Sequence, residues 1–182
     1  MVTIKRKAIF LDRDGVVNVA PVVNGLPTSP MNACELVVID GIRDLVKEFK
    51  QKEYVVVVVT NQPEVARGRL KKESLKEMND LISRESGIEH FYVCPHDDSN
   101  FCKCRKPRPG LIYDAANELN LDLERSFLVG DRWKDIEAGN AAGCRSIWID
   151  LNYAEREPTK YFSRVSTLTT ASDLILRFQH ES

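Results

Sequence analysis

The sequence predicts an α/β fold, a doubly wound parallel sheet with helices on both faces. Two observations predict it. Short apolar segments of the length of buried strands recur along the chain, and segments with helical periodicity separate them. Strands that alternate with helices pair in parallel through right-handed crossovers. The length of 182 residues, with 43% hydrophobic and 29% charged residues, suits one globular domain with an ordinary core.

The first half of the chain supplies two strands and the helix between them. Residues 8–11 and 54–60 are apolar without alternation, as strands covered on both faces are, and the second contains five consecutive valines. Residues 41–52 place four apolar side chains on one stripe of a helix. Asp40, directly before this helix, is expected to cap it.

The second half continues the alternation. The expected elements are a helix over 69–84, a strand over 90–93, a helix over 110–119, a strand over 126–129, a helix over 135–142, a strand over 145–149 and a helix over 171–179. Together they predict a single Rossmann-like domain over residues 1–182 with no large cap domain. Residues 16–38 mix prolines, Asn and Gly with scattered apolar residues, and we expect a short flap, either irregular or a small hairpin.

Composition excludes several classes of partner. A net charge of -1 gives no footprint for binding nucleic acid. The longest apolar run, residues 55–59, is far too short to span a membrane, and the N-terminal segment lacks the pattern of a signal peptide. Five cysteines, an odd number, favour reduced thiols. We therefore expect a cytoplasmic, monomeric protein without nucleic-acid or membrane partners.

Two acids follow the first strand directly. Asp12 and Asp14 lie two residues apart, so they share one side of the chain, and Gly15 allows a sharp turn. Ligands bind at the carboxyl ends of strands in such sheets. The pair suits a divalent cation and acid/base chemistry. Asp-x-Asp-Gly alone is more often a plain turn, and the spacing does not fit a calcium loop.

Two further segments carry groups that can hold a phosphate. Thr60, Asn61 and Gln62 end the second strand with neutral donors, although such residues are also common in turns. Arg105 and Lys106 stand before prolines that stiffen the chain. Lys and Arg are the usual means of gripping phosphate, whereas the alternative is a solvated basic turn.

The strand over residues 126–129 leads into a second acidic segment. Asp131 is placed to join Asp12 and Asp14 around a cation. Asp135, four residues on at the start of a helix, can hydrogen-bond back into the site or cap its helix. Arg132 can contact a substrate phosphate or be solvated.

Three cysteines and a histidine crowd into eleven residues. Cys94, His96, Cys102 and Cys104 form a four-ligand set of the kind that binds structural zinc. A disulfide between Cys102 and Cys104 would be strained. Because the last ligand is two residues from the predicted phosphate-binding lysine, this zinc loop (residues 94–106) is expected to anchor it.

These segments, in this order and each at a strand end or in a loop beside one, resemble the motifs of the haloacid dehalogenase superfamily of phosphotransferases. The resemblance implies that Asp12 attacks phosphorus and forms an aspartyl-phosphate. It implies that Asp14 protonates the leaving oxygen and later deprotonates water. Thr60 and Lys106 would hold the transferring group. Mg²⁺ would bind Asp12, the backbone carbonyl of Asp14, and Asp131.

The zinc loop is similar to that of the subgroup of heptose 1,7-bisphosphate and histidinol-phosphate phosphatases. Residues 10–15, 60–62, 66–68 and 104–107 lean toward the heptose branch, whereas the short stretch between the histidine and the second cysteine is closer to the other.

The resemblance implies a Mg²⁺-dependent phosphatase of a small phosphorylated metabolite. The leading substrate is the C7 phosphate of D-glycero-D-manno-heptose 1,7-bisphosphate. Histidinol phosphate or another sugar phosphate is the alternative, and a nucleic-acid end phosphatase a weaker one. The residues expected to contact substrate are Asn61, Gln62, Arg105 and Arg132, with Arg105 on the sugar-linked phosphate, while Asp135 supports the metal ligands.

Overall fold

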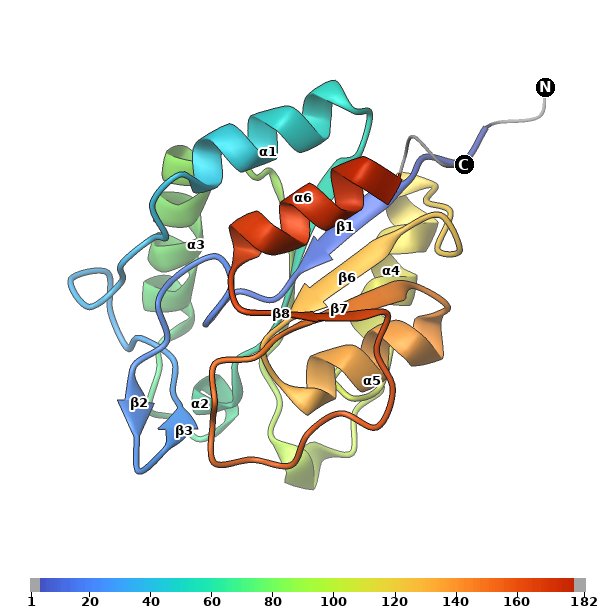
Figure 1. Cartoon of the computed structure of the whole chain (residues 1–182). Coiled ribbons are helices and arrows are strands. Elements are labelled where there is room, and N and C mark those ends of the chain that lie inside the picture. The colour runs from blue at the N-terminus through green and yellow to red at the C-terminus, as the bar shows by residue number, and fades with distance from the viewer. Residues whose placement is uncertain (1–3, 179–182) are drawn as a thin grey trace.

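The computed structural model describes residues 4–178, and a six-stranded parallel sheet forms its centre (Figure 1). The strand order is β5-β4-β1-β6-β7-β8. The strands are β1 (Ala8–Leu11), β4 (Val55–Asn61), β5 (His90–Cys94), β6 (Phe127–Gly130), β7 (Arg145–Ile149) and β8 (Ser163–Val165). The chain builds outward from β1 in one direction and then in the other, so the order reverses between β1 and β6. Such a switch point is where open α/β sheets bind ligands.

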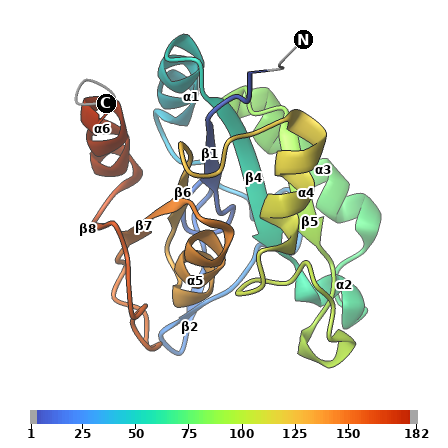
Figure 2. The ribbon, with the colours of Figure 1, turned by 90° about the vertical axis from the view of Figure 1, so that its right-hand side faces the viewer.

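Helices cover both faces of the sheet, which confirms the predicted doubly wound fold (Figure 2). The helices are α1 (Ile42–Gln51), α2 (Pro63–Ala66), α3 (Lys72–Ser86), α4 (Gly110–Leu119), α5 (Trp133–Ala142) and α6 (Leu168–Phe178), with a short 3₁₀ turn, η1 (Asp98–Asn100). The core clusters place α1, α3 and α6 on one face, and α4 and α5 on the other.

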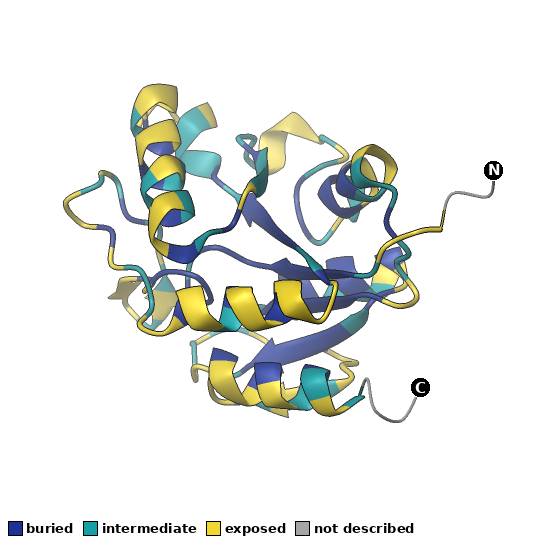
Figure 3. Cartoon of the chain, turned by 90° about the horizontal axis from the view of Figure 1, so that it is seen from above, coloured by how far each residue is buried: buried dark blue, intermediate teal, exposed yellow. Residues whose placement is uncertain are grey.

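The central strand β1 is buried on both faces because its side chains alternate between two cores. Ile9 and Leu11 pack into the core under α1, α3 and α6, whereas Ala8 and Phe10 pack into the core under α4 and α5. None of these four side chains is exposed. Figure 3 shows the central strands in the colour of buried residues, between helices whose outer surfaces are exposed. This two-sided burial fixes the register of β1.

The register of the three central strands brings their carboxyl ends level. Leu11 of β1 pairs with Val58 of β4 and with Val129 of β6. The backbone N–H of Asp12 then donates to the Val129 carbonyl at 3.0 Å. The residues that follow β1, β4 and β6 therefore meet at one edge of the sheet.

The flap (residues 16–38) contains a small hairpin, one of the two forms expected from the sequence. Strands β2 (Val22–Val23) and β3 (Leu26–Pro27) pair in antiparallel fashion. Asn24 and Gly25 join them with φ of 52° and 77°, the conformation that a two-residue type I′ turn needs. The start of the flap is fixed to the core, because Val16 and Val17 are fully buried.

Several boundaries differ from the prediction. Gly41, in a left-handed conformation, rather than Asp40, stands at the start of α1, and no side-chain cap forms there. Helix α5 begins two residues earlier than expected and α3 three residues later, while α6 begins three residues earlier. Residue 179 of the predicted last helix lies outside the described residues. The sequence did not predict α2 or β8, because α2 has four residues and β8 is a three-residue edge strand with two polar side chains.

Among residues 4–178, no helix has the length and apolar character needed to cross a membrane.

Candidate active site and metal centres

The carboxyl ends of β1 and β6 bring three buried acids together around one lysine. Nζ of Lys106 donates to Oδ1 of Asp12 at 2.6 Å and lies 2.6 Å from Oδ1 of Asp135. Asp12, Asp131 and Asp135 each offer an oxygen within 4.8 Å of the others. All four side chains are buried. The predicted convergence of separate strand ends on one point is thus present in the structure.

The charges of this cluster do not balance. Three carboxylates and one ammonium group leave two negative charges in a buried site. Burial raises the pKa of Asp12 to about 7, with a further contribution from the charge of Asp135, and only Lys106 opposes this rise. Burial also raises the pKa of Asp131, helped by the charge of Asp12. Burial alone would lower the pKa of Lys106, but its two carboxylate partners outweigh this and raise it. The lysine therefore stays charged, and its single positive charge is shared between Asp12 and Asp135.

Asp131 provides the clearest sign that a cation belongs in this site. Both of its carboxylate oxygens are buried, and neither receives a well-formed hydrogen bond from residues 4–178, although the hydroxyl of Tyr153 lies beside them. Buried carboxylates without such partners are paired with charges or coordinate metals. Gly15, at φ 94°, makes room for Asp131, because a Cβ there would lie 1.9 Å from Oδ2. An all-oxygen site with two uncompensated negative charges fits Mg²⁺.

The stability of the protein without Mg²⁺ is expected to fall as pH rises from about 4 to about 7. In this window the folded protein holds a proton on Asp12, whose pKa is about 7, whereas an unfolded Asp of pKa about 3.9 does not. The folded state then binds more protons, so raising the pH favours unfolding. Mg²⁺ favours ionised ligands, so it should flatten the decline.

Unfolding of Mg²⁺-free protein in denaturant between pH 4 and 8, with and without added Mg²⁺, measures this effect. The loss of unfolding free energy that Asp12 alone can cause is at most roughly 4 kcal/mol, because its pKa is shifted by about three units. Equal slopes with and without the ion would show that the acids do not form its site.

The carboxylate of Asp14 is not part of this cluster and has partners of its own. Oδ1 accepts from Asn18 at 3.0 Å, and Oδ2 accepts from Ser29 and from Gln62, both at 2.8 Å. Arg13, which is fully buried, donates to both oxygens. The backbone carbonyl therefore remains the group by which Asp14 is predicted to bind Mg²⁺.

The residues that end β4 mainly hold other site residues in place. The side chain of Asn61 clamps the backbone of Lys106, donating to its carbonyl and accepting from its N–H, both at 3.1 Å. Gln62 is fully buried and also donates to Oγ1 of Thr60 at 2.9 Å. The substrate contacts predicted for Asn61 and Gln62 stay predictions.

Asp135 combines both roles that its sequence position allowed. Its Oδ2 accepts from the backbone N–H of Arg132 at 3.0 Å and caps α5, while Oδ1 pairs with Lys106. Gly130 allows this close approach, because a Cβ there would lie 2.2 Å from the Cβ of Asp135. The capping bond fixes the start of α5 against the lysine.

A cavity of about 50 Å³ opens onto Asp12 and Lys106, with room for about four water-sized groups. Thr60 and Asn61 line it, as the sequence suggested. Three flap residues and Lys134 also line it, and sequence reasoning missed them; the flap residues are Pro27, Thr28 and Ser29. Of these four residues, only Lys134 could have been predicted from the sequence, because it follows Arg132 by two residues.

Two cations, Arg132 and Lys134, line the cavity, and a third, Arg105, is next to Lys106 along the chain. Arg132 lines the cavity, and its Nε donates to Glu155 at 2.8 Å. Arg105 does not line it, because its Nε donates to Asp98 at 2.8 Å. Burial lowers the pKa of Lys134. A phosphate contact by Arg105 would therefore require it to leave its acidic partner.

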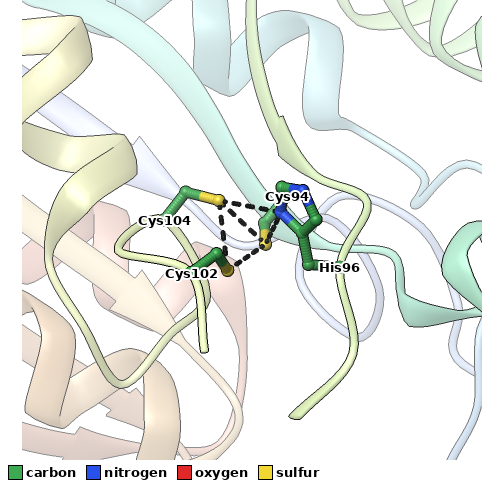
Figure 4. Close-up of side chains that lie close together, drawn as sticks. All are labelled: Cys94, His96, Cys102 and Cys104. Atoms are coloured by element: carbon green, nitrogen blue, oxygen red, sulfur yellow. Dashed lines mark hydrogen bonds between the residues drawn. The ribbon is translucent and has the colours of Figure 1, made fainter. Parts of the chain in front are cut away.

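The four predicted zinc ligands lie together at the end of β5 (Figure 4). The three sulfurs are 3.1–3.6 Å apart, and Nδ1 of His96 lies 3.3 Å from Cys104 and 3.6 Å from Cys94. Around zinc with bonds of about 2.0–2.3 Å, tetrahedral ligands stand about 3.5–3.8 Å apart. The group has the composition and nearly the dimensions of a structural zinc site.

The zinc loop packs tightly against the elements that carry the predicted catalytic groups. The Cys94 carbonyl accepts from the backbone N–H of Gln62 at 2.7 Å. Gly110, at the start of α4, touches the other end of the loop, since a Cβ there would lie 2.4 Å from the Lys103 carbonyl. The cluster thus joins β5 to the segment that presents Lys106.

Comparison with known proteins agrees with this site. The model of the HAD-hydrolase-like family matches residues 103–173. The chain is 41% identical over 147 residues to the D-glycero-β-D-manno-heptose-1,7-bisphosphate 7-phosphatase of Yersinia pestis, covering 74% of this chain and 75% of that protein. It is 37% identical over 147 residues to the protein of the same name from Escherichia coli K12, with 74% of each chain covered.

Solved structures give the same result. The D,D-heptose 1,7-bisphosphate phosphatase of B. bronchiseptica, in complex with magnesium and phosphate, has a TM-score of 0.82 and 27% identity, covering 94% of this chain and 99% of that one. A HAD-like phosphatase from Mesorhizobium loti has a TM-score of 0.78 and 28% identity, covering 97% and 87%. The chain therefore belongs to the haloacid dehalogenase superfamily of phosphoric monoester hydrolases, in the family of the heptose-1,7-bisphosphate 7-phosphatases.

Proposed function

We propose that this phosphatase removes the C7 phosphate of D-glycero-D-manno-heptose 1,7-bisphosphate through an aspartyl-phosphate on Asp12. The observation that carries the proposal is the buried cluster in which Asp12 and Asp135 share Lys106 beside the buried carboxylate of Asp131. The curated relatives bear the name of this activity, and the chain spans about three quarters of their length.

Asp12 acts as the nucleophile in this proposal. Its contact with Lys106 fixes the carboxylate at the floor of the cavity. A carboxyl group whose pKa is about 7 is only half ionised at neutral pH, so it must lose its proton before it attacks. Mg²⁺, held by Asp12, Asp131 and the backbone carbonyl of Asp14, would supply positive charge that favours the ionised acid and offsets the charge of the phosphoryl group.

Lys106 and Thr60 hold the phosphoryl group, and Asp14 handles the protons. The ammonium group of Lys106 lies beside the nucleophile and can neutralise charge that develops on the phosphoryl oxygens. Asp14 gives a proton to the leaving sugar oxygen, and the freed carboxylate then takes a proton from the water that hydrolyses the aspartyl-phosphate. Phosphate leaves and Asp12 is restored.

The cations at the cavity mouth support a substrate with a second phosphate. Arg132 and Lys134 line the cavity, and Arg105 is the next residue to Lys106 along the chain. A bisphosphate would bring the negative charge needed to displace Asp98 and Glu155 from these cations. The short η1 turn before Cys102, however, keeps the histidinol-phosphate activity as the second candidate.

We also propose that the protein is cytoplasmic and monomeric, consists of a single phosphatase domain and has no nucleic-acid partners. The free thiols of the zinc-ligand group support a reducing compartment, because thiolates bind the ion.

Steady-state kinetics on the heptose bisphosphate, histidinol phosphate and a nucleic-acid 5′-phosphate tests the substrate. We expect kcat/KM for the bisphosphate to exceed that for histidinol phosphate by about tenfold or more, since one lost phosphate contact costs about 1.5–3 kcal/mol. A tenfold preference for histidinol phosphate would end the heptose assignment. Asp44→Asn, a change of charge at an exposed position on α1, serves as the control variant.

A further inference from the structure

The flap makes a direct contact with the acid proposed to handle the protons. The hydroxyl of Ser29 donates to Oδ2 of Asp14 at 2.8 Å, and Ser29 lines the cavity. We propose that Ser29 is a positioning residue, which holds the carboxyl group of Asp14 so that it can exchange a proton with the leaving oxygen. The proposal rests on the acid/base role of Asp14 given above.

The other partners of Asp14 lie in the buried core, including Asn18 at the fixed start of the flap. Arg13, Asn18 and Gln62 are fully buried. Arg13 is held from behind by Oδ1 of Asn79 on α3, at 3.2 Å. Ser29 differs from them, because it is half-buried and lies two residues after the end of β3. Of these partners, it is the one that follows the hairpin of the flap, so the position of the hairpin can act on the acid through it.

Ser29 is also chemically different from the other three partners. A general acid must carry a proton in one step and lack it in the next, so its partners must suit both states. Guanidinium groups only donate, and an amide must turn its whole end group to accept. A hydroxyl accepts as soon as its hydrogen rotates. Of these four partners, Ser29 can therefore serve Asp14 in both protonation states without moving a heavy atom.

The flap is held in the position that this contact requires. The Pro21 carbonyl accepts from both the backbone N–H of Thr28, at 2.7 Å, and its hydroxyl, at 2.9 Å, which closes the base of the hairpin. At the tip, the carbonyl of Gly25 accepts from the backbone N–H of Ala154 at 2.8 Å. A Cβ on Gly25 would lie 2.8 Å from the Cβ of Ala154, so the tip fits closely. Both ends of the hairpin thus fix the place of Ser29.

The contact at the tip links the flap to the loop between β7 and β8 (residues 150–162) (Figure 1). This loop carries Glu155, the partner of Arg132, and Tyr153, whose hydroxyl lies beside Asp131. Burial and the charge of Asp131 raise the pKa of Tyr153, so it stays a neutral phenol there. The flap therefore contacts Asp14, and the loop that it touches contacts Asp131, a predicted metal ligand.

The test uses substrates that differ in their need for an acid. A sugar phosphate releases a poor leaving group that must be protonated, whereas p-nitrophenyl phosphate releases a stable anion. Since kcat/KM reports only the steps up to departure of the leaving group, it isolates the proton donation. We expect Ser29→Ala to lower kcat/KM for the sugar phosphate about tenfold, through kcat rather than KM, and for p-nitrophenyl phosphate less than threefold.

Paired variants separate this effect from disturbance of the flap. Ser29→Thr keeps the hydroxyl and should retain most of the activity. Valine has the shape of threonine but no hydroxyl, so Ser29→Val should resemble Ser29→Ala. Cys34→Ala, a truncation at an exposed position of the same flap, should change neither substrate by more than twofold. Equal losses on both substrates, an effect confined to KM, or Val as good as Thr would overturn the proposal.

The outcome is distinguishable from failure of the proposed function. If Asp12→Asn still turns over, the phosphoryl-transfer mechanism fails and the question of Ser29 falls with it. If Asp12→Asn is inactive while Ser29→Ala behaves like Cys34→Ala, only the role of Ser29 is wrong.

Discussion

Replacing Asp12 by asparagine is expected to lower kcat by at least about 10³-fold, because removal of a nucleophile disables the unit of residues that acts with it. An amide can accept a hydrogen bond from Lys106 but cannot form the acyl phosphate. The fold should survive, since the change also removes one of the like charges that burial disfavours at this site.

The measurement is kcat on the heptose bisphosphate at saturating Mg²⁺, with the unfolding midpoint as a check of the fold. Asp80→Asn is the matched control, because it makes the same change in an exposed ion pair with Lys76 on α3. It should retain full activity. A variant at position 12 with more than about a tenth of normal turnover would assign the nucleophile to another group.

Replacing Cys104 by serine is expected to release zinc and to lower kcat about 100-fold, even though the zinc site takes no part in the chemistry. Lys106 follows this ligand by two residues, and its Nζ must stay within 2.6 Å of Asp12. A displacement of about 1 Å in a positioned catalytic group can cost about 10²-fold in rate. Structural zinc also supplies folding free energy directly, so the loop should loosen.

Elemental analysis, kinetics and hydrogen exchange over residues 94–106 test this prediction together. Cys34→Ser is the matched control, since that thiol is exposed and distant in sequence from the zinc loop. It should keep its zinc and its rate. Zinc-free protein of full activity would show that the loop holds its shape without the ion.

The sequence was most informative where chemistry and backbone geometry coincide. Apolar segments that end in Asp12, Thr60 and Asp131 predicted strand ends at one edge of a parallel sheet, and the register of β1 with β4 and β6 places them there. The zinc ligands were visible because four soft ligands in eleven residues rarely have another use.

Contacts that depend on loop conformation were not accessible in the same way. Ser29 reaches Asp14 only because the hairpin folds back over the sheet, and nothing in a Thr-Ser-Pro stretch indicates that path. The sequence also did not indicate that the Asn61 amide clamps the backbone of Lys106, because the two residues are 45 positions apart. Cys34 is exposed on the flap, although free cysteines are usually buried, so burial cannot be inferred from residue type alone at a loop position.

The central claim is that the phosphoryl group passes through the carboxylate of Asp12, and mass spectrometry of the phosphorylated enzyme tests it most directly. Protein mixed with substrate and Mg²⁺, quenched in acid and digested, should carry one phosphoryl group on the peptide that contains residues 8–14, at Asp12. A phosphoryl group on another residue, or turnover with no phosphorylated enzyme under conditions that trap acyl phosphates, would contradict the account.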